Sequence, residues 1–120
     1  MKAGDIDQVV KEIKKERGVE AIYLFGSMAT GKAKPYSDAD ICVITEKGAR
    51  RERILSNASK LIDTKIFWDL PLNIRFRVFR EGRPLYVRNR MLLQRIECDT
   101  VLSYLDFKPL LERHFSRFLA

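Results

Sequence analysis

Residues 25–40 read Phe25-Gly26-Ser27-Met28-Ala29-Thr30-Gly31-Lys32-Ala33-Lys34-Pro35-Tyr36-Ser37-Asp38-Ala39-Asp40, and they join two apolar runs of the chain. The first run ends at the Gly-Ser pair, and the second begins at the two aspartates. In a strand, residues i and i+2 point to the same face, so Asp38 and Asp40 would present their carboxylates side by side. Carboxylates in apolar surroundings repel each other unless a cation lies between them. The spacing therefore predicts a divalent-cation site at the mouth of a buried strand.

The Gly26-Ser27 pair predicts a phosphate site at the carboxyl end of the preceding strand. Gly26 lets the backbone approach a ligand closely, and the Ser27 hydroxyl adds a donor. We expect residues 28–34 to form a short helix or turn whose first amide groups point at the same anion. Alone, a Gly-Ser pair after a strand indicates a turn, so the phosphate interpretation depends on the aspartates that follow.

Gly26-Ser27, ten intervening residues and then Asp38-x-Asp40 resemble the signature of the DNA polymerase β-like nucleotidyltransferase superfamily. The short chain resembles its minimal nucleotidyltransferases, which are often the antitoxin partners of helical HEPN proteins. Residues 80–86 and 104–110 are also similar to these proteins, so the resemblance covers nearly the whole chain. It implies an α/β (α+β) fold: one nucleotidyltransferase domain over 1–120, with a small mixed β-sheet, helices packed on it and a C-terminal helical segment.

The resemblance also implies an activity. Asp38 and Asp40 would bind Mg²⁺, as two ions about 4 Å apart, and Asp63 would supply the third carboxylate. Gly26, Ser27 and Ser37 would hold the nucleotide, with ATP as the donor, AMP as the transferred group and pyrophosphate as the leaving group. The implied acceptor is a tyrosine of a HEPN toxin. The alternative is a catalytically weak antitoxin that acts by direct contact with a helical partner.

The third carboxylate has two candidates in the sequence, Asp63 and Asp69. Both would point to the same face of a regular strand over 63–71. They would lie roughly 20 Å apart at about 3.3 Å per residue, so both cannot serve one site. The resemblance favours Asp63, near the start of the strand. As purely structural residues, Asp63 would cap the preceding helix and Asp69 the following one, leaving no third ligand.

Composition places the chain among ordinary globular proteins with anionic partners. It has 120 residues, 46% hydrophobic and 32% charged, with a net charge of +7. No apolar stretch approaches the roughly 20 residues of a membrane span, and the N-terminus is not signal-like, so we expect no membrane association and a cytoplasmic location. Cys42 and Cys98 lack metal-type spacing and are interpreted as reduced core thiols.

Hydrophobic periodicity and turn residues predict the remaining elements. Asp5 and Gln8 suggest a capping box for the first helix. We expect, in chain order, a helix over 5–17, strands over 21–25 and 39–45, a helix over 49–62, a strand over 63–71, a helix from Pro71 to Gly82, an edge strand over 83–87, and a helix over 91–119 that Pro109 kinks or breaks.

Two surfaces have more than one interpretation. Seven arginines between Arg75 and Arg95 form either a solvated helix face or a docking patch for nucleic acid or a partner. An aromatic stripe near the C-terminus either folds onto the sheet or meets another chain, which is a partner or a second copy in a homo-oligomer. The stripe contains Phe107, Leu111, Phe115 and Phe118. His114, the one histidine, is interpreted as structural.

Overall fold

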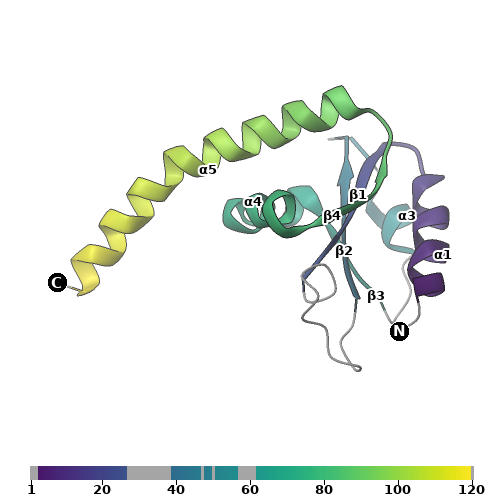
Figure 1. Cartoon of the computed structure of the whole chain (residues 1–120), viewed down its shortest axis with the longest axis horizontal. Helices are drawn as coiled ribbons and strands as arrows, with labels where there is room; N and C mark the ends of the chain where they lie inside the picture. Colours follow the sequence, from purple (N-terminus) through teal and green to yellow (C-terminus); the bar gives the residue numbers. More distant parts are fainter. Residues whose placement is uncertain (1–2, 27–38, 47, 50, 57–61, 120) are drawn as a thin grey trace.

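The computed structural model describes residues 3–26, 39–46, 48–49, 51–56 and 62–119 (Figure 1). In chain order the elements are α1 (Ala3–Lys14), β1 (Val19–Phe25), β2 (Ala39–Thr45), α3 (Arg51–Ser56), β3 (Ile62–Ile66), the 3-10 helix η1 (Phe67–Asp69), α4 (Leu72–Glu81), β4 (Arg83–Val87) and α5 (Arg90–Leu119). Within these ranges, no helix combines the length and the apolar character needed to cross a membrane.

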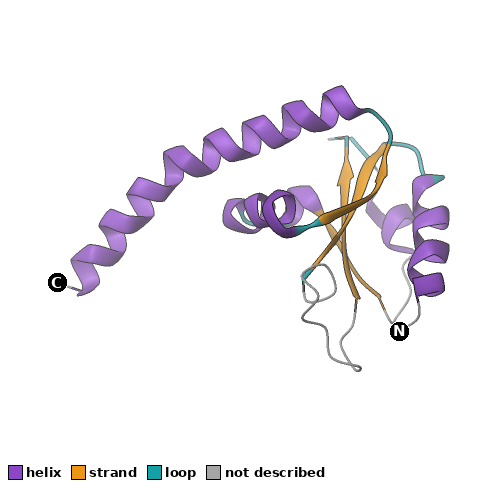
Figure 2. Ribbon diagram, in the orientation of Figure 1, coloured by secondary structure: helices purple, strands orange, loops and turns teal. Residues whose placement is uncertain are grey.

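The four strands form one mixed sheet in the order β3-β2-β1-β4 (Figure 2). β1 pairs antiparallel with β2 and with β4, whereas β2 and β3 are parallel. The predicted mixed sheet and α/β class are confirmed. β4 lies at the edge, as expected from Pro84, because a residue without an N–H group does least harm there.

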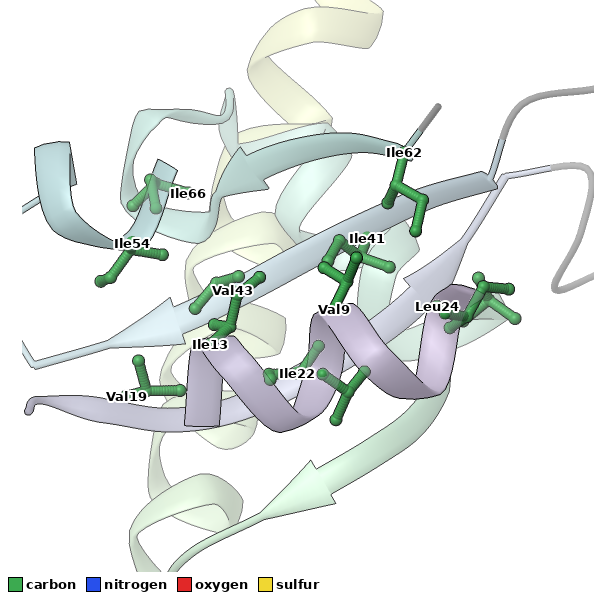
Figure 3. Packing of buried hydrophobic residues seen from close by; sticks show 12 residues of the cluster. Val9, Ile13, Val19, Ile22, Leu24, Ile41, Val43, Ile54, Ile62 and Ile66 are labelled. Atoms are coloured by element: carbon green, nitrogen blue, oxygen red, sulfur yellow. The ribbon is translucent and has the colours of Figure 1, made fainter. Parts of the chain in front are cut away.

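α1 and α3 cover one face of the sheet (Figure 1). The apolar stripe of α1 packs onto β1 and β2, as Figure 3 shows for Val9 and Ile13 above Ile22, Ile41 and Val43. Ile13, Ile22, Ile41 and Val43 are fully buried, and burying such a side chain contributes about 1.5–3 kcal/mol. Because strand residues alternate between faces, this packing directs the intervening residues of β2, Asp40 and Cys42, to the opposite face.

α4 and the first turns of α5 cover that opposite face (Figure 1). Its buried core consists of Ala21, Tyr23, Cys42, Ile44, Phe67, Val78 and Leu93. The Phe67 ring, fully buried, contacts the rings of Trp68 and Phe79 edge-on, with centroid distances of 4.9 and 5.5 Å. Aromatic pairs of this kind add about 0.5–1.5 kcal/mol each beyond area burial.

The predicted segment 49–71 differs from the structure at two points. The helix expected over 49–62 corresponds to α3, which is described over Arg51–Ser56; residues 57–61 lie outside the described residues, and Ile62 already belongs to β3. The strand expected over 63–71 ends at Ile66, because η1 turns Phe67 into the core and the Trp68 indole donates a hydrogen bond to the Thr45 carbonyl oxygen at 2.7 Å. Apolar and β-prone residues continued through this turn, so the sequence pattern did not reveal it.

The two terminal helices also differ from the prediction. α1 begins at Ala3, so Asp5 lies within it, and Gln8 donates to Glu12 at 3.2 Å instead of completing a capping box. α5 begins after Asn89, whose Oδ1 accepts hydrogen bonds from the first free amides of the helix at 3.1 and 3.2 Å. Of the kink or break predicted at Pro109, the break does not occur, since α5 continues to Leu119 and extends well beyond the sheet (Figure 1).

Candidate active site

Gly26 ends β1 in a backbone conformation that favours glycine. Its φ is +79°, in the left-handed region that L side chains rarely adopt. A Cβ atom at this position would lie 2.6 Å from Oδ2 of Asp40, closer than van der Waals contact allows. The backbone of Gly26, the first residue of the predicted phosphate loop, therefore lies directly beside the carboxylate of Asp40.

Asp40 and Asp63 occupy matching positions at the same end of the sheet. In the parallel pairing of β2 with β3, Asp40 is the direct register partner of Asp63, and in the pairing of β2 with β1 it faces Phe25. Asp40 has the parity of Cys42, which packs under α4, whereas Asp63 alternates with Ile62, which packs under α1. Both carboxylates consequently lie on the α4 side of the sheet.

These two carboxylates differ in their surroundings. Asp40 is half-buried beside Gly26. The Asp63 side chain is 51% exposed, and its Oδ1 lies 3.5 Å from Nζ of Lys65. Neighbouring strands are about 4.8 Å apart, so two carboxylates in register on one face are close enough to share a divalent cation. They are the described groups of the predicted site that can hold Mg²⁺.

Asp69 lies elsewhere. The chain leaves β3 at Ile66, so Asp69 belongs to η1, and the strand parity that made it a candidate does not apply. Its Oδ1 forms an ion pair with Arg51 at 2.8 Å. Because β3 begins beside Asp40 and runs away from it, Asp69 lies beyond the opposite end of the strand from Asp63.

Three of the predicted site residues, Ser27, Ser37 and Asp38, lie outside the described residues. Within the described part of the chain, no three Asp, Glu, His or Cys side chains gather as a metal cluster. The candidate site therefore consists here of Gly26, Asp40 and Asp63, and the assignment of ligands stays a prediction.

A cavity of about 200 Å³ adjoins this end of the sheet. It is lined by Phe25, Gly26, Ile74, Arg77 and Glu81. A larger cavity of about 380 Å³ opens at the other end of the sheet, beneath α5, and contains none of the predicted site residues. The smaller cavity is the one that adjoins the candidate site, because Gly26 belongs to its lining. The contribution of α4 was not predicted, although Ile74, Arg77 and Glu81 share the i, i+3, i+7 spacing of one helix face.

Arg75 has a structural role. Its guanidinium donates to the carbonyl oxygens of Phe67 and Trp68 at 3.3 and 2.8 Å, and it lies over both rings at 5.7 and 5.4 Å from their centroids. It thereby fixes η1 against α4. Sequence reasoning treated it as one member of an arginine cluster.

Two more arginines of that cluster are in ion pairs. Arg88 donates to the buried Glu20 at 2.9 Å, and Arg77 lies 3.3 Å from Glu81. The other four arginines are exposed; they are Arg80, Arg83, Arg90 and Arg95. The cluster therefore combines structural and solvated residues, and nucleic-acid binding stays a prediction.

The two thiols lie in different environments. Cys42 is fully buried, as predicted, and burial raises its pKa to about 12, so it stays protonated. The prediction that Cys98 is a core thiol is wrong, because Cys98 is exposed. Residues of α5 at helical spacing from the buried Leu93 and Thr100 face inward, and Cys98 lies on the other side.

The fold matches chains of solved toxin-antitoxin complexes. A toxin-antitoxin solved with AMP-PNP is similar at 20% identity and a TM-score of 0.76, covering 95% of this chain and 98% of that one. A complex of MntA with HepT gives 16% identity and a TM-score of 0.75, covering 99% and 100%. A complex of a tri-AMPylated Shewanella oneidensis HEPN toxin with an MNT antitoxin gives 17% and 0.72, covering 98% and 95%.

These identities are low enough that the likeness establishes the fold alone. No curated protein sequence matches significantly. The sequence profile for polymerase beta nucleotidyltransferases, however, matches residues 7–91, which include Gly26, Asp40 and Asp63. The chain therefore belongs to the polymerase beta nucleotidyltransferase family.

Proposed function

We propose that this chain is a Mg²⁺-dependent adenylyltransferase that moves AMP from ATP to the hydroxyl group of a tyrosine in a HEPN-type toxin. By modifying the toxin, the chain acts as an antitoxin. The observation that carries the proposal is the register that sets Asp40 beside Asp63, with Gly26 against Asp40. A metal site and a phosphate loop then share one end of the sheet.

In this proposal each residue has a distinct task. Asp38, Asp40 and Asp63 hold the divalent cations, which neutralise the triphosphate charge. Gly26 and Ser27 hold the terminal phosphates, with Ser37 near the nucleotide. Asp63, the more exposed of the two described carboxylates, faces the acceptor and takes its proton.

The proposed step is an in-line displacement. The acceptor oxygen forms a bond to the α-phosphorus of ATP, and the bond from that phosphorus to the bridging oxygen of the β-phosphate breaks. Pyrophosphate leaves with the electron pair, and the hydroxyl proton passes to the Asp63 carboxylate. The product is an AMP ester of the acceptor. Orientation of the reacting groups and charge neutralisation supply the catalysis.

Donor and acceptor are inferred from the proteins that share the fold. One was solved with AMP-PNP, and another lies in a complex with a tri-AMPylated HEPN toxin. The bound AMP-PNP and the AMP-modified toxin were observed with those related chains. They support ATP as the donor here and a HEPN protein as the acceptor.

Transfer of label tests the proposal. The full chain is incubated with Mg²⁺, α-³²P-labelled ATP and a cognate HEPN protein. The partner should become labelled, and a variant carrying Asp38→Ala and Asp40→Ala should transfer no label. Equal labelling by that variant would refute the proposed catalytic site.

A second candidate is neutralisation by contact without catalysis. The observation that favours it is the solvent-facing side of α5, where Leu102 and Leu105 are 61% and 53% exposed. This candidate predicts that the double aspartate variant still protects cells from the HEPN protein, whereas Leu105→Asp does not. The enzymatic proposal predicts loss of protection by the aspartate variant.

A further inference from the structure

The lining of the cavity beside Gly26 includes a positively charged side chain, Arg77, whose role the candidate site does not explain. Among the described residues that line it, Arg77 is the one positive charge, and Glu81 is the one negative charge. Arg77 and Glu81 share one face of α4 with Ile74, so Arg77 belongs to the wall of the cavity that faces the end of β1. Phe25 and Gly26 form the wall across from it.

The position of this wall is fixed by close packing of α4 on β1. At Gly82, directly after α4, a Cβ atom would lie 3.1 Å from the Tyr23 ring and 3.3 Å from the Leu24 carbonyl oxygen. Phe79 contacts the Tyr23 ring edge-on at a centroid distance of 5.5 Å. α4 therefore cannot shift far from β1, and Arg77 is held near Gly26 by the fold.

The present partner of Arg77 is easily exchanged. Its ion pair with Glu81 is a single contact of 3.3 Å between side chains that are 60% and 36% exposed. Exposed pairs of this kind contribute little net stability. A phosphate group accepts two parallel hydrogen bonds from a guanidinium and carries more charge than a carboxylate.

We propose that Arg77 is a phosphate-binding residue for the triphosphate of the nucleotide, which it contacts by exchanging Glu81 for the β- or γ-phosphate. This inference rests on the proposed function, because it needs the nucleotide to lie at Gly26. Glu81 is then a competitor that holds the guanidinium when the nucleotide is absent. The ligand class is a nucleoside triphosphate, and the base contributes nothing to this contact.

Titration calorimetry with Mg²⁺ and AMP-PNP on the full chain tests the proposal. Arg77→Ala should weaken binding about tenfold, as the loss of about 1.4 kcal/mol implies, and Arg77→Lys should fall between it and the wild type. Glu81→Gln should strengthen binding two- to threefold, on the order of the small worth of an exposed pair. Arg80→Ala is the matched control, because Arg80 is an exposed arginine of the same helix outside the cavity lining.

Adenosine is the second probe, because it lacks phosphates. Its binding should be the same in the wild type and Arg77→Ala, and the melting temperatures of both should agree. Equal AMP-PNP affinity in Arg77→Ala and Arg80→Ala would overturn the proposal, as would weaker binding in Glu81→Gln or an equal loss of adenosine binding. If the Arg77 proposal failed in this way, the proposed function would still stand, provided that the wild type bound AMP-PNP and Asp40→Asn abolished transfer. A wild type that bound no AMP-PNP would refute both.

Discussion

Replacing Gly26 with alanine tests the link between the phosphate loop and Asp40. The new methyl group meets two obstacles. Residue 26 would have to keep a φ near +79° with a side chain attached, and its methyl carbon would lie 2.6 Å from Oδ2 of Asp40. Either the backbone of the loop or the carboxylate has to move, and both belong to the candidate site.

The two obstacles have different consequences. The left-handed conformation costs a residue with a Cβ atom about 1–2 kcal/mol. For a domain of this size, each kcal/mol lowers the melting temperature by about 4 °C, so we expect a decrease of about 4–8 °C. Displacement of Asp40 by a fraction of an ångström or more acts on turnover, where misplacing a reacting group by about 1 Å can cost about 100-fold.

The assay measures transfer of label at a temperature well below both melting temperatures. Gly48→Ala is the control, because Gly48 lies outside the left-handed region and a Cβ there has no atom within 4 Å. We expect transfer to fall about 100-fold in Gly26→Ala and to be unchanged in Gly48→Ala. A Gly26→Ala protein that melts lower but transfers AMP normally would show that Asp40 is not part of the site.

Three further predictions concern other parts of the chain. Asp63→Asn should lower AMP transfer by about 100-fold or more. Asp69→Asn should leave transfer unchanged and lower the free energy of unfolding by about 0.2–1 kcal/mol in a denaturant titration. If Asp69→Asn lowered transfer and Asp63→Asn did not, Asp69 would be the third carboxylate. Cys98 should react quickly with a thiol reagent at pH 8 and Cys42 only on unfolding. Because burial raises the pKa of Cys42 from 9.0 to about 12, its contribution to stability is complete below pH 9 and declines as the pH rises towards 12. Arg75→Ala should destabilise the fold by about 2–3 kcal/mol through loss of two charge-assisted hydrogen bonds and ring contacts, measured by chemical denaturation, and a loss below about 0.5 kcal/mol would show that η1 does not depend on it.

Local sequence signals predicted the parts of the fold that they encode directly. The apolar run of β2 identified a strand buried on both faces, and Pro84 identified an edge strand. The end of β1 at Gly26 was visible because glycine there follows a compact β-prone run. These features follow from residue type and neighbouring positions alone.

The errors arose where tertiary contacts outweigh local pattern. Phe67 and Trp68 are strong strand formers, yet they form a 3-10 turn because the Phe67 ring fills the core and the indole reaches Thr45. Cys98 was misplaced because free cysteine is among the residue types most often buried, whereas the rotation of α5 about its axis is set by Leu93 and Thr100. The break expected at Pro109 does not occur in α5.

In the candidate site, too, some residues could be predicted from local sequence, whereas others depend on tertiary pairing. Spacing in the chain selected Gly26 and Asp40, but it left Asp63 and Asp69 open, since both have the same parity in a regular strand. The register of β2 with β3 is a pairing between segments far apart in sequence, and it sets Asp63 beside Asp40. The position of Arg77 beside Gly26 likewise depends on how α4 packs on β1.

The measurement that tests the central claim most directly is anomalous diffraction from crystals of the full chain grown with AMP-PNP and Mn²⁺ in place of Mg²⁺. We predict an anomalous peak within about 2.0–2.6 Å of the carboxylate oxygens of both Asp40 and Asp63, with the phosphates of AMP-PNP against Gly26. A fully bound nucleotide whose metal contacts neither carboxylate would contradict the account.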